Sequence, residues 1–291
     1  MIIERDLRSQ VAVDARRVAE AAIAEDGDRD VTTMVTVGPS QIATGVIECR
    51  GGGVAAGLTY ADAVVGVCGL APVNWYYAPG TELAAGSTLG LLQGDLIRIL
   101  RAERSLLNLL QRAVGVATLT KAFVDRVRGT DAQILHTRKT APGLRLLDVT
   151  AVVAGGGHVH RLDLATTVMV KDNHWRALRQ SGKPLARALE EARALGVSDC
   201  FVEVESSEQV GEACAAGATR LLIDNQMPER VRQWSQRARA DRPGIEIEAT
   251  GGITLENVRA YAEAGADYIS LGVLTHSVHA ADVAMELGSE T

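Results

Sequence analysis

Basic side chains follow several apolar segments in the second half of this sequence, each close to the point where the segment ends. Arg138 and Lys139 come after the run AQIL, Lys171 comes directly after TTVMV, and His276 lies just beyond DYISL. A single Lys or Arg in such a place is usually a solvated loop residue. Several of them after successive segments favour one cationic site for a small polyanion, because Arg and Lys pair with carboxylate and phosphate groups.

Acidic side chains lie in neighbouring segments. Glu203 is inside the apolar run CFVEV, Glu205 follows two residues later, and Asp224 ends the run RLLID. Alternation along an extended chain puts Glu203 and Glu205 on one face. An unpaired carboxylate inside an apolar strand is costly, so we expect a metal ion or a ribose as partner. A structural salt bridge for Glu203 and a helix N-cap for Asp224 are the alternatives.

A second basic cluster follows the glycines at 155–157. Glycine lets the backbone turn tightly and approach a ligand, and His158, His160 and Arg161 come directly after. The two histidines project to one side of an extended chain, which allows a metal pair. We disfavour that interpretation because Arg161 and Lys171 would repel a cation.

A third cluster, Thr250, Gly251 and Gly252, follows the run IEIEA. We expect a helix capped by Thr254 after it, so that backbone N–H groups and the helix dipole form a phosphate site. Gly272 would supply a second loop to this site. The alternative is an ordinary strand-to-helix turn.

The elements that position these residues are short β-branched runs, separated by helical stretches. Such alternation predicts a parallel sheet covered on both faces. No GxGxxG follows the first run, which disfavours an open dinucleotide-binding sheet and leaves a barrel, with fewer strands than the usual eight. The six runs are 132–136, 166–170, 200–204, 220–224, 245–249 and 267–271.

The first part of the chain has a different pattern. Apolar spacing predicts helices over 11–25 and 102–128, and Gly115 is expected to kink or split the second of these. Glycine-broken runs over 40–100 indicate a small antiparallel sheet.

Composition limits the class of protein. The 291 residues carry a formal net charge of −6, with 47% hydrophobic residues, which disfavours a nucleic-acid binder and wholesale disorder. We find no secretory signal and no apolar run of membrane-spanning length. The four cysteines form no CxxC pair, so we expect reduced thiols in a cytoplasmic protein.

The same motifs, in order along nearly the whole chain, resemble the quinolinate phosphoribosyltransferase (carboxylating nicotinate-nucleotide pyrophosphorylase) family. The most specific are TRKTAPGLR and KDNH. The others are DVTT, AERSLLNLLQRAVGVAT, AGGGHVHRLDL, EVESSEQ, LLIDN, EATGGITLENVRAYAEAGADYISLG and LTHS.

This resemblance implies an N-terminal α/β sandwich domain at 1–115, whose final helix can return from the C-terminus. A phosphoribosyltransferase α/β-barrel domain with fewer than eight strands would occupy 116–291. Members join quinolinate to phosphoribosyl pyrophosphate with Mg²⁺, and release pyrophosphate and carbon dioxide. The product is nicotinate mononucleotide, a precursor of NAD. They assemble as homodimers or larger homo-oligomers in which a neighbouring subunit completes the active site.

The resemblance also implies roles for individual residues. The expected catalytic residues are Lys139 and Lys171, which face the pyrophosphate, and Glu203 and Asp224, which hold the ribose and Mg²⁺. The expected substrate-binding residues are Arg104 from a neighbouring subunit, Arg138, His160 and Arg161 for the dicarboxylate, and Thr250, Gly251, Gly252, Gly272 and His276.

Two positions depart from the family pattern. His136 stands before TRKT, where Asp is common, and Val159 stands before His160, where Asn or Ser is common. Both leave the basic cluster intact. They keep open the alternative of a paralogue that phosphoribosylates another pyridine or aromatic carboxylate. A non-catalytic anion-binding protein is disfavoured, because it would not need Glu203 and Asp224.

Overall fold

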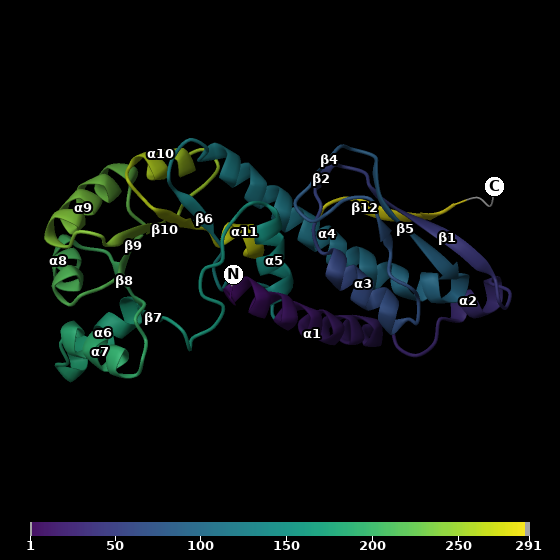
Figure 1. Cartoon of the computed structure of the whole chain (residues 1–291), viewed down its shortest axis with the longest axis horizontal. Helices are drawn as coiled ribbons and strands as arrows, with labels where there is room; N and C mark the ends of the chain where they lie inside the picture. Colours follow the sequence, from purple (N-terminus) through teal and green to yellow (C-terminus); the bar gives the residue numbers. More distant parts are fainter. Residues whose placement is uncertain (1, 289–291) are drawn as a thin grey trace. The chain divides into compact units, whose positions relative to one another are not determined.

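A computed structural model of the chain describes residues 2–288, which form two compact units (Figure 1). The first unit contains the described residues up to Lys121, the segment Lys139–Gly156 and the residues from Val273 onward. The second contains Ala122–Arg138 and Gly157–Gly272. The predicted domains 1–115 and 116–291 stay a prediction, because each unit is assembled from more than one stretch of chain.

The first unit is built on an antiparallel sheet in the order β12-β1-β5-β3, as the glycine-broken runs indicated. Its strands are β1 (Ile42–Cys49), β3 (Asn74–Trp75), β5 (Ser87–Asp95) and β12 (Val283–Leu287), and β2 (Gly53–Val54) pairs separately with β4 (Glu82–Leu83). Its helices are α1 (Ile2–Glu25), α2 (Val31–Thr36), α3 (Leu58–Val67), α5 (Arg145–Ala154), α11 (Val273–His276) and most of α4 (Leu96–Arg126).

The returning C-terminal segment is a strand rather than the helix that the resemblance suggested. β12 pairs antiparallel with β1, with Cys49 opposite Val283. In β1 the residues Gly45, Ile47 and Cys49 are buried, while those between them are only partly buried. This alternation is typical of a strand with one face on a core, so β12 extends a sheet that already has a defined inner face.

Helix α4 is one continuous helix of 31 residues, so the predicted split at Gly115 is wrong, while the predicted kink stays a prediction. A Cβ at this position would lie 2.2 Å from the carbonyl oxygen of His279. The close approach of the C-terminal segment to the helix therefore explains the glycine.

The second unit contains a parallel sheet in the order β6-β11-β10-β9-β8-β7, and all six predicted strands are confirmed. The strands are β6 (Gln133–Leu135), β7 (Val168–Val170), β8 (Cys200–Val204), β9 (Arg220–Asp224), β10 (Glu246–Thr250) and β11 (Tyr268–Ser270). The helices are α6 (Asp172–Ser181), α7 (Leu185–Ala194), α8 (Ser207–Ala215), α9 (Pro228–Asp241) and α10 (Val258–Glu263).

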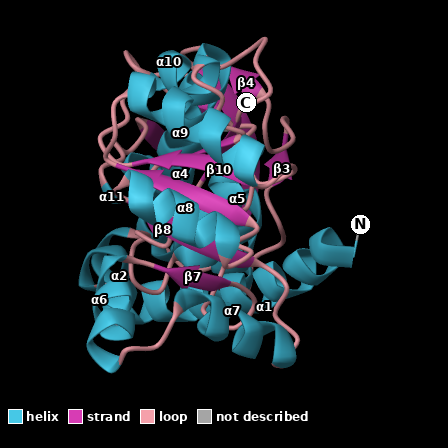
Figure 2. Ribbon diagram, turned by 90° about the vertical axis from the view of Figure 1, so that its left-hand side faces the viewer, coloured by secondary structure: helices cyan, strands magenta, loops and turns pink. Residues whose placement is uncertain are grey.

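This sheet curves into a partial barrel with fewer than eight strands. Among the described residues no ladder joins β6 to β7, although Leu135 of β6 forms a parallel bridge with His158. All five residues of β8 are buried, as expected for a central strand covered on both faces. Helices α8 and α9 lie on the outer side of β8 and β9 (Figure 2). The carboxyl ends of the six parallel strands therefore meet at one rim.

All four cysteines are free, and Cys49, Cys200 and Cys214 are buried, in agreement with the expected reduced thiols. A membrane-crossing helix, which would have to be long and apolar, is not found in the part of the chain that the structure describes.

Candidate active site

Two arginines of the second unit lie close together at the carboxyl ends of the strands. Arg138 follows β6, and its Nε is buried without a hydrogen-bond partner among the described residues. The pKa of Arg161 is lowered, first by burial and next by the positive charge of Arg138. Like charges that repel each other in a partly buried place favour a bound anion. A planar dicarboxylate would supply acceptors for both guanidinium groups.

His160 is buried beside these arginines and is held by Glu248 of β10. Its Nε2 lies 3.1 Å from Glu248 Oε2, and its Nδ1 accepts a hydrogen bond of 2.7 Å from the backbone N–H of Arg161. His158 is exposed. Among the residues that the structure describes, no group of three or more side chains that could hold a metal ion is found.

Lys171 and Glu203 form an ion pair between the ends of β7 and β8. Glu203 is buried, and the indole N–H of Trp175 in α6 donates to its backbone carbonyl at 2.8 Å. The backbone N–H of Lys171 donates to His174 Nδ1 at 3.0 Å, which fixes the first turn of α6. The salt bridge that the sequence left open for Glu203 is thus present. It brings an ammonium group and a carboxylate to the same rim as the arginines.

Asp224 ends β9 beside Glu203. Burial raises its pKa above the ordinary value, and the negative charge of Glu203 raises it further. Asn225 has a left-handed backbone with φ of 51° and donates from its side chain to Asp224 Oδ2 at 2.7 Å. The N-cap of α9 is Met227, so the alternative in which Asp224 caps this helix is wrong.

The carboxylate pair fits a magnesium ion only with help from a ligand. Glu203 and Asp224 repel each other, a situation that a bound cation relieves. Mg²⁺ is commonly held by one or two carboxylates together with waters and substrate phosphates, and does not need an all-protein cage. Glu205 lies beyond the end of β8 and is exposed, although it also contributes to the raised pKa of Asp224.

The glycine cluster after β10 forms a tight turn against Asn225. Gly251 and Gly252 both have positive φ, of 81° and 62°. A Cβ on Gly251 would lie 2.3 Å from Asn225 Oδ1, so only glycine fits there. The predicted cap at Thr254 is wrong, because α10 begins at Val258 with Asn257 at its N-cap position. A turn separates the glycines from this short helix, so any anion binding here depends on the N–H groups of the turn itself.

Three predicted site residues belong to the first unit. Arg104 is an exposed residue of α4, and its side chain forms no hydrogen bond or ion pair with another described residue. Lys139 is exposed, and its backbone carbonyl accepts a hydrogen bond of 2.8 Å from the hydroxyl of Thr275. His276 follows Thr275 and contacts Ser277 Oγ through Nδ1 at 2.6 Å. Thr275 therefore links the segment of Lys139 to that of His276.

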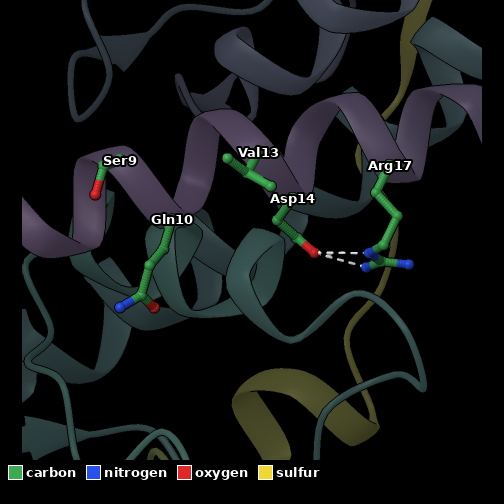
Figure 3. Close-up of a pocket in the computed structure, with 5 residues that line it drawn as sticks. All are labelled: Ser9, Gln10, Val13, Asp14 and Arg17. Carbon is green, nitrogen blue, oxygen red and sulfur yellow. Dashed lines mark hydrogen bonds and ion pairs between the residues drawn. The ribbon is translucent and has the colours of Figure 1, made fainter.

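The loop after Lys139 is anchored to the first unit at two further points. The backbone N–H of Ala141 donates to Asp148 Oδ2 at 3.1 Å, and Arg17 of α1 donates to the carbonyl of Gly143 at 2.5 Å. Arg17 is itself held by Asp14, one turn earlier on the same helix (Figure 3). These contacts give the Lys139 loop a defined conformation.

Residue patterns missed some of the groups that hold the site together. Glu248 is a buried carboxylate inside the apolar run IEIEA, which is the same signal that marks Glu203 in the run CFVEV. Arg112 and Asp148 gave no such signal, because charged residues are common in helices and only the fold shows that a half-buried Arg112 pairs with a buried Asp148.

Comparisons with known proteins match both parts of the chain to one family. Residues 30–114 match the N-terminal domain, and residues 116–286 the C-terminal domain, of quinolinate phosphoribosyl transferase. A nicotinate-nucleotide pyrophosphorylase [carboxylating] of Mycobacterium leprae is 40% identical over 263 residues, which cover 89% of this chain and 91% of that protein. A mitochondrial quinolinate phosphoribosyltransferase [decarboxylating] of Nicotiana glauca is 35% identical over 95% of this chain and 83% of its own length.

Solved structures show the same fold. The nicotinate-nucleotide pyrophosphorylase of Francisella tularensis superposes with a TM-score of 0.87 at 28% identity, over 95% of this chain and 97% of that one. A Streptococcus pyogenes structure, described as NadC, gives a TM-score of 0.84 at 32% identity over 93% and 95% of the two chains. The chain therefore belongs to the quinolinate phosphoribosyltransferase family.

Proposed function

We propose that this chain transfers the phosphoribosyl group from phosphoribosyl pyrophosphate to quinolinate with loss of one carboxyl group. The products are nicotinate mononucleotide, pyrophosphate and carbon dioxide. The observation that supports this most directly is the pair of partly buried arginines, Arg138 and Arg161, beside the Lys171–Glu203–Asp224 group. One part of the site suits a planar dicarboxylate, and the other suits a ribose and a departing pyrophosphate.

In the proposed reaction the arginines hold the two carboxylates of quinolinate, and thereby orient the ring nitrogen. This nitrogen attacks the anomeric carbon of the sugar while the bond to pyrophosphate breaks. Glu203 and Asp224 stabilise the positive charge that develops on the sugar, and Lys171 and Lys139 stabilise the charge on pyrophosphate. The positive charge on the ring nitrogen then stabilises the electron pair that carbon dioxide leaves on the neighbouring ring carbon, and this carbon takes up a proton from solvent to give nicotinate mononucleotide.

We further propose that Glu203 and Asp224 are the protein ligands of a Mg²⁺ ion. The ion, when bound, would neutralise charge on the pyrophosphate leaving group. In a thermal unfolding experiment, Mg²⁺ with phosphoribosyl pyrophosphate should stabilise the unmodified protein beyond the effect of either alone. Loss of this extra stabilisation in Asp224→Asn is expected. If that variant retains it in full, Asp224 is not a ligand.

The reaction is tested by incubating the purified protein with Mg²⁺, phosphoribosyl pyrophosphate and quinolinate. Formation of equal amounts of nicotinate mononucleotide and carbon dioxide is the expected result. A parallel panel of pyridine and aromatic carboxylates tests the alternative acceptor that His136 and Val159 keep open. Turnover with another carboxylate but not with quinolinate would establish that alternative, and no turnover with any acceptor would contradict both.

We also propose that the protein forms a homodimer or larger homo-oligomer in which Arg104 reaches the active site of a neighbouring subunit. In support, Arg104 is a guanidinium on α4 that is exposed and forms no ion pair with the described residues. Arg104→Ala and Lys139→Ala should each be inactive. Mixed under conditions that allow subunit exchange, they should regain activity, because some sites then contain both intact residues. If mixtures stay inactive although mass spectrometry shows exchanged subunits, the site is not shared.

A further inference from the structure

Glu248 is a buried acid at the centre of the second unit with no role in the chemistry described above. It is 1% exposed, and its Oε2 lies 3.1 Å from both His160 Nε2 and Arg220 Nη1. Burial alone would raise the pKa of this carboxyl, but hydrogen bonds from His160 and Ser270 and the positive charge of Arg220 hold it below its ordinary value. Glu248 is therefore an anion that the fold keeps ionised.

The hydrogen bonds of His160 define its tautomer. The backbone N–H of Arg161 donates to Nδ1 at 2.7 Å, which requires a lone pair on that nitrogen. In the neutral ring the proton is then on Nε2, and this N–H donates to Glu248. Both ring nitrogens are thus engaged within the protein, and the side chain is only 6% exposed.

The other side of Glu248 is equally fixed. Arg220 lies between the rings of Phe201 and Tyr268, 4.3 Å and 3.8 Å from their centroids. Its Nε donates to Glu246 at 2.8 Å. A guanidinium held between two aromatic faces and a second carboxylate has little freedom to move. The Glu248 carboxylate is consequently held between the immobile guanidinium of Arg220 and the imidazole of His160.

We propose that Glu248 is a positioning residue that acts through His160 on Arg161. Glu248 fixes the Nε2–H tautomer, Nδ1 then holds the backbone N–H of Arg161, and the Arg161 guanidinium is aimed at the carboxylates of quinolinate. His160 is the link between Glu248 and Arg161 in this chain of contacts. The inference rests on the proposed function only for the identity of the ligand; the tautomer and the chain of contacts do not depend on it.

The first test is nitrogen NMR of the histidine side chains, with His160 assigned through a His160→Gln variant. We expect a neutral ring with the proton on Nε2, unchanged when quinolinate is added. The opposite tautomer, a doubly protonated ring, or a change of tautomer on adding quinolinate would each overturn the proposal. This measurement needs no catalytic activity, so it is informative even if quinolinate is not the acceptor.

The second test compares binding in variants that fold normally by circular dichroism. In Glu248→Met the quinolinate dissociation constant should rise about tenfold or more, the size of one lost hydrogen bond of about 1.4 kcal/mol. Phosphoribosyl pyrophosphate binding should be unchanged. Glu248→Gln, whose amide oxygen still accepts from Nε2–H, should recover most of the affinity, and it carries the test if the Met variant misfolds. Glu212→Gln, an exposed acid of α8, is the matched control.

Unchanged quinolinate affinity in Glu248→Met, with the unmodified protein active, would refute the positioning role while leaving the proposed function standing. Equal weakening of both substrates would also refute it, because that result indicates general disruption of the barrel. If the unmodified protein does not bind quinolinate at all, the proposed function fails instead, and the NMR result alone decides the arrangement of His160.

Discussion

Arg112 and Asp148 form a two-point ion pair in the first unit, with Nε and Nη2 each 2.7 Å from a different carboxylate oxygen. Asp148 is completely buried. Its Oδ2 also accepts the backbone N–H of Ala141, and Arg112 donates to the carbonyl of Thr275 at 2.9 Å. One ion pair therefore ties α4 and α5 to the loop that follows Lys139 and to α11.

Replacing Arg112 by Met should destabilise the protein strongly, because it leaves the buried charge of Asp148 without its partner. The expected loss is about 3–5 kcal/mol of unfolding free energy, measured by urea titration. Arg128→Ala is the control, since it breaks an exposed ion pair with Asp125 and should cost at most about 1 kcal/mol. Similar losses in the two variants would contradict the importance of the buried pair.

Sequence patterns predicted the strands of the second unit well because a buried parallel strand is both continuous and apolar. β8 and β9 are buried along nearly their whole length, so their sequences contain few polar residues other than the functional ones. Glu203 and Asp224 stand out against that background. Each is also followed by a helix, which places its side chain at the rim once the strand is known to be parallel.

Contacts between distant segments could not be predicted in the same way. A glycine inside a helical pattern looks the same in the sequence whether it bends the helix or makes room for a distant segment of the chain. Only the structure shows that the backbone of His279 lies against Gly115. Thr254 has the right residue type for a cap, but the turn at 254–257 delays the helix to Val258. Both outcomes depend on tertiary packing, which overrides local preference.

Asp224→Asn should stabilise the protein at neutral pH while it lowers activity. The raised pKa of Asp224 means that the folded state binds the proton more tightly than the unfolded chain does. Ionisation of Asp224 therefore destabilises the fold, and this cost is fully present above the raised pKa. It disappears as pH falls below the ordinary value of 3.8.

Urea midpoints measured across pH, without Mg²⁺ or substrate, test this prediction. The variant should exceed the unmodified protein at pH 7, and the difference should vanish in acid. Exposed Asp131→Asn should change the free energy of unfolding by no more than about 0.5 kcal/mol at any pH. Activity of Asp224→Asn should fall by about 10²-fold. A destabilised variant at pH 7 would show that the carboxylate contributes favourably to folding.

Gly251→Ala should lose both stability and activity. The left-handed backbone alone costs an alanine about 1–2 kcal/mol, and the new Cβ would lie 2.3 Å from Asn225 Oδ1. Asn225 would have to move, and with it the hydrogen bond to Asp224. Gly244→Ala separates the two effects, because Gly244 has φ of 86° but nothing within 4 Å of the added Cβ. We expect the control to lose stability only, while Gly251→Ala also loses at least about tenfold in kcat/KM.

Gly115→Ala tests whether the glycine in α4 is needed for the C-terminal segment. Gln111, one turn earlier, accepts the backbone N–H of Ala281 and donates its side chain to the carbonyl of Val283, both at 2.9 Å. A Cβ at Gly115 would push against His279 and strain these bonds, at a cost of about 1–3 kcal/mol.

The matched variant is Gly66→Ala in α3, where nothing lies within 4 Å of the added Cβ. There the better helix propensity of alanine should stabilise the protein by up to about 1 kcal/mol. Urea titrations should therefore show a lower free energy of unfolding for Gly115→Ala and a higher one for Gly66→Ala. The two helices differ in whether there is room for the added methyl group. A stabilising Gly115→Ala would mean that the segment can move away from α4 without loss.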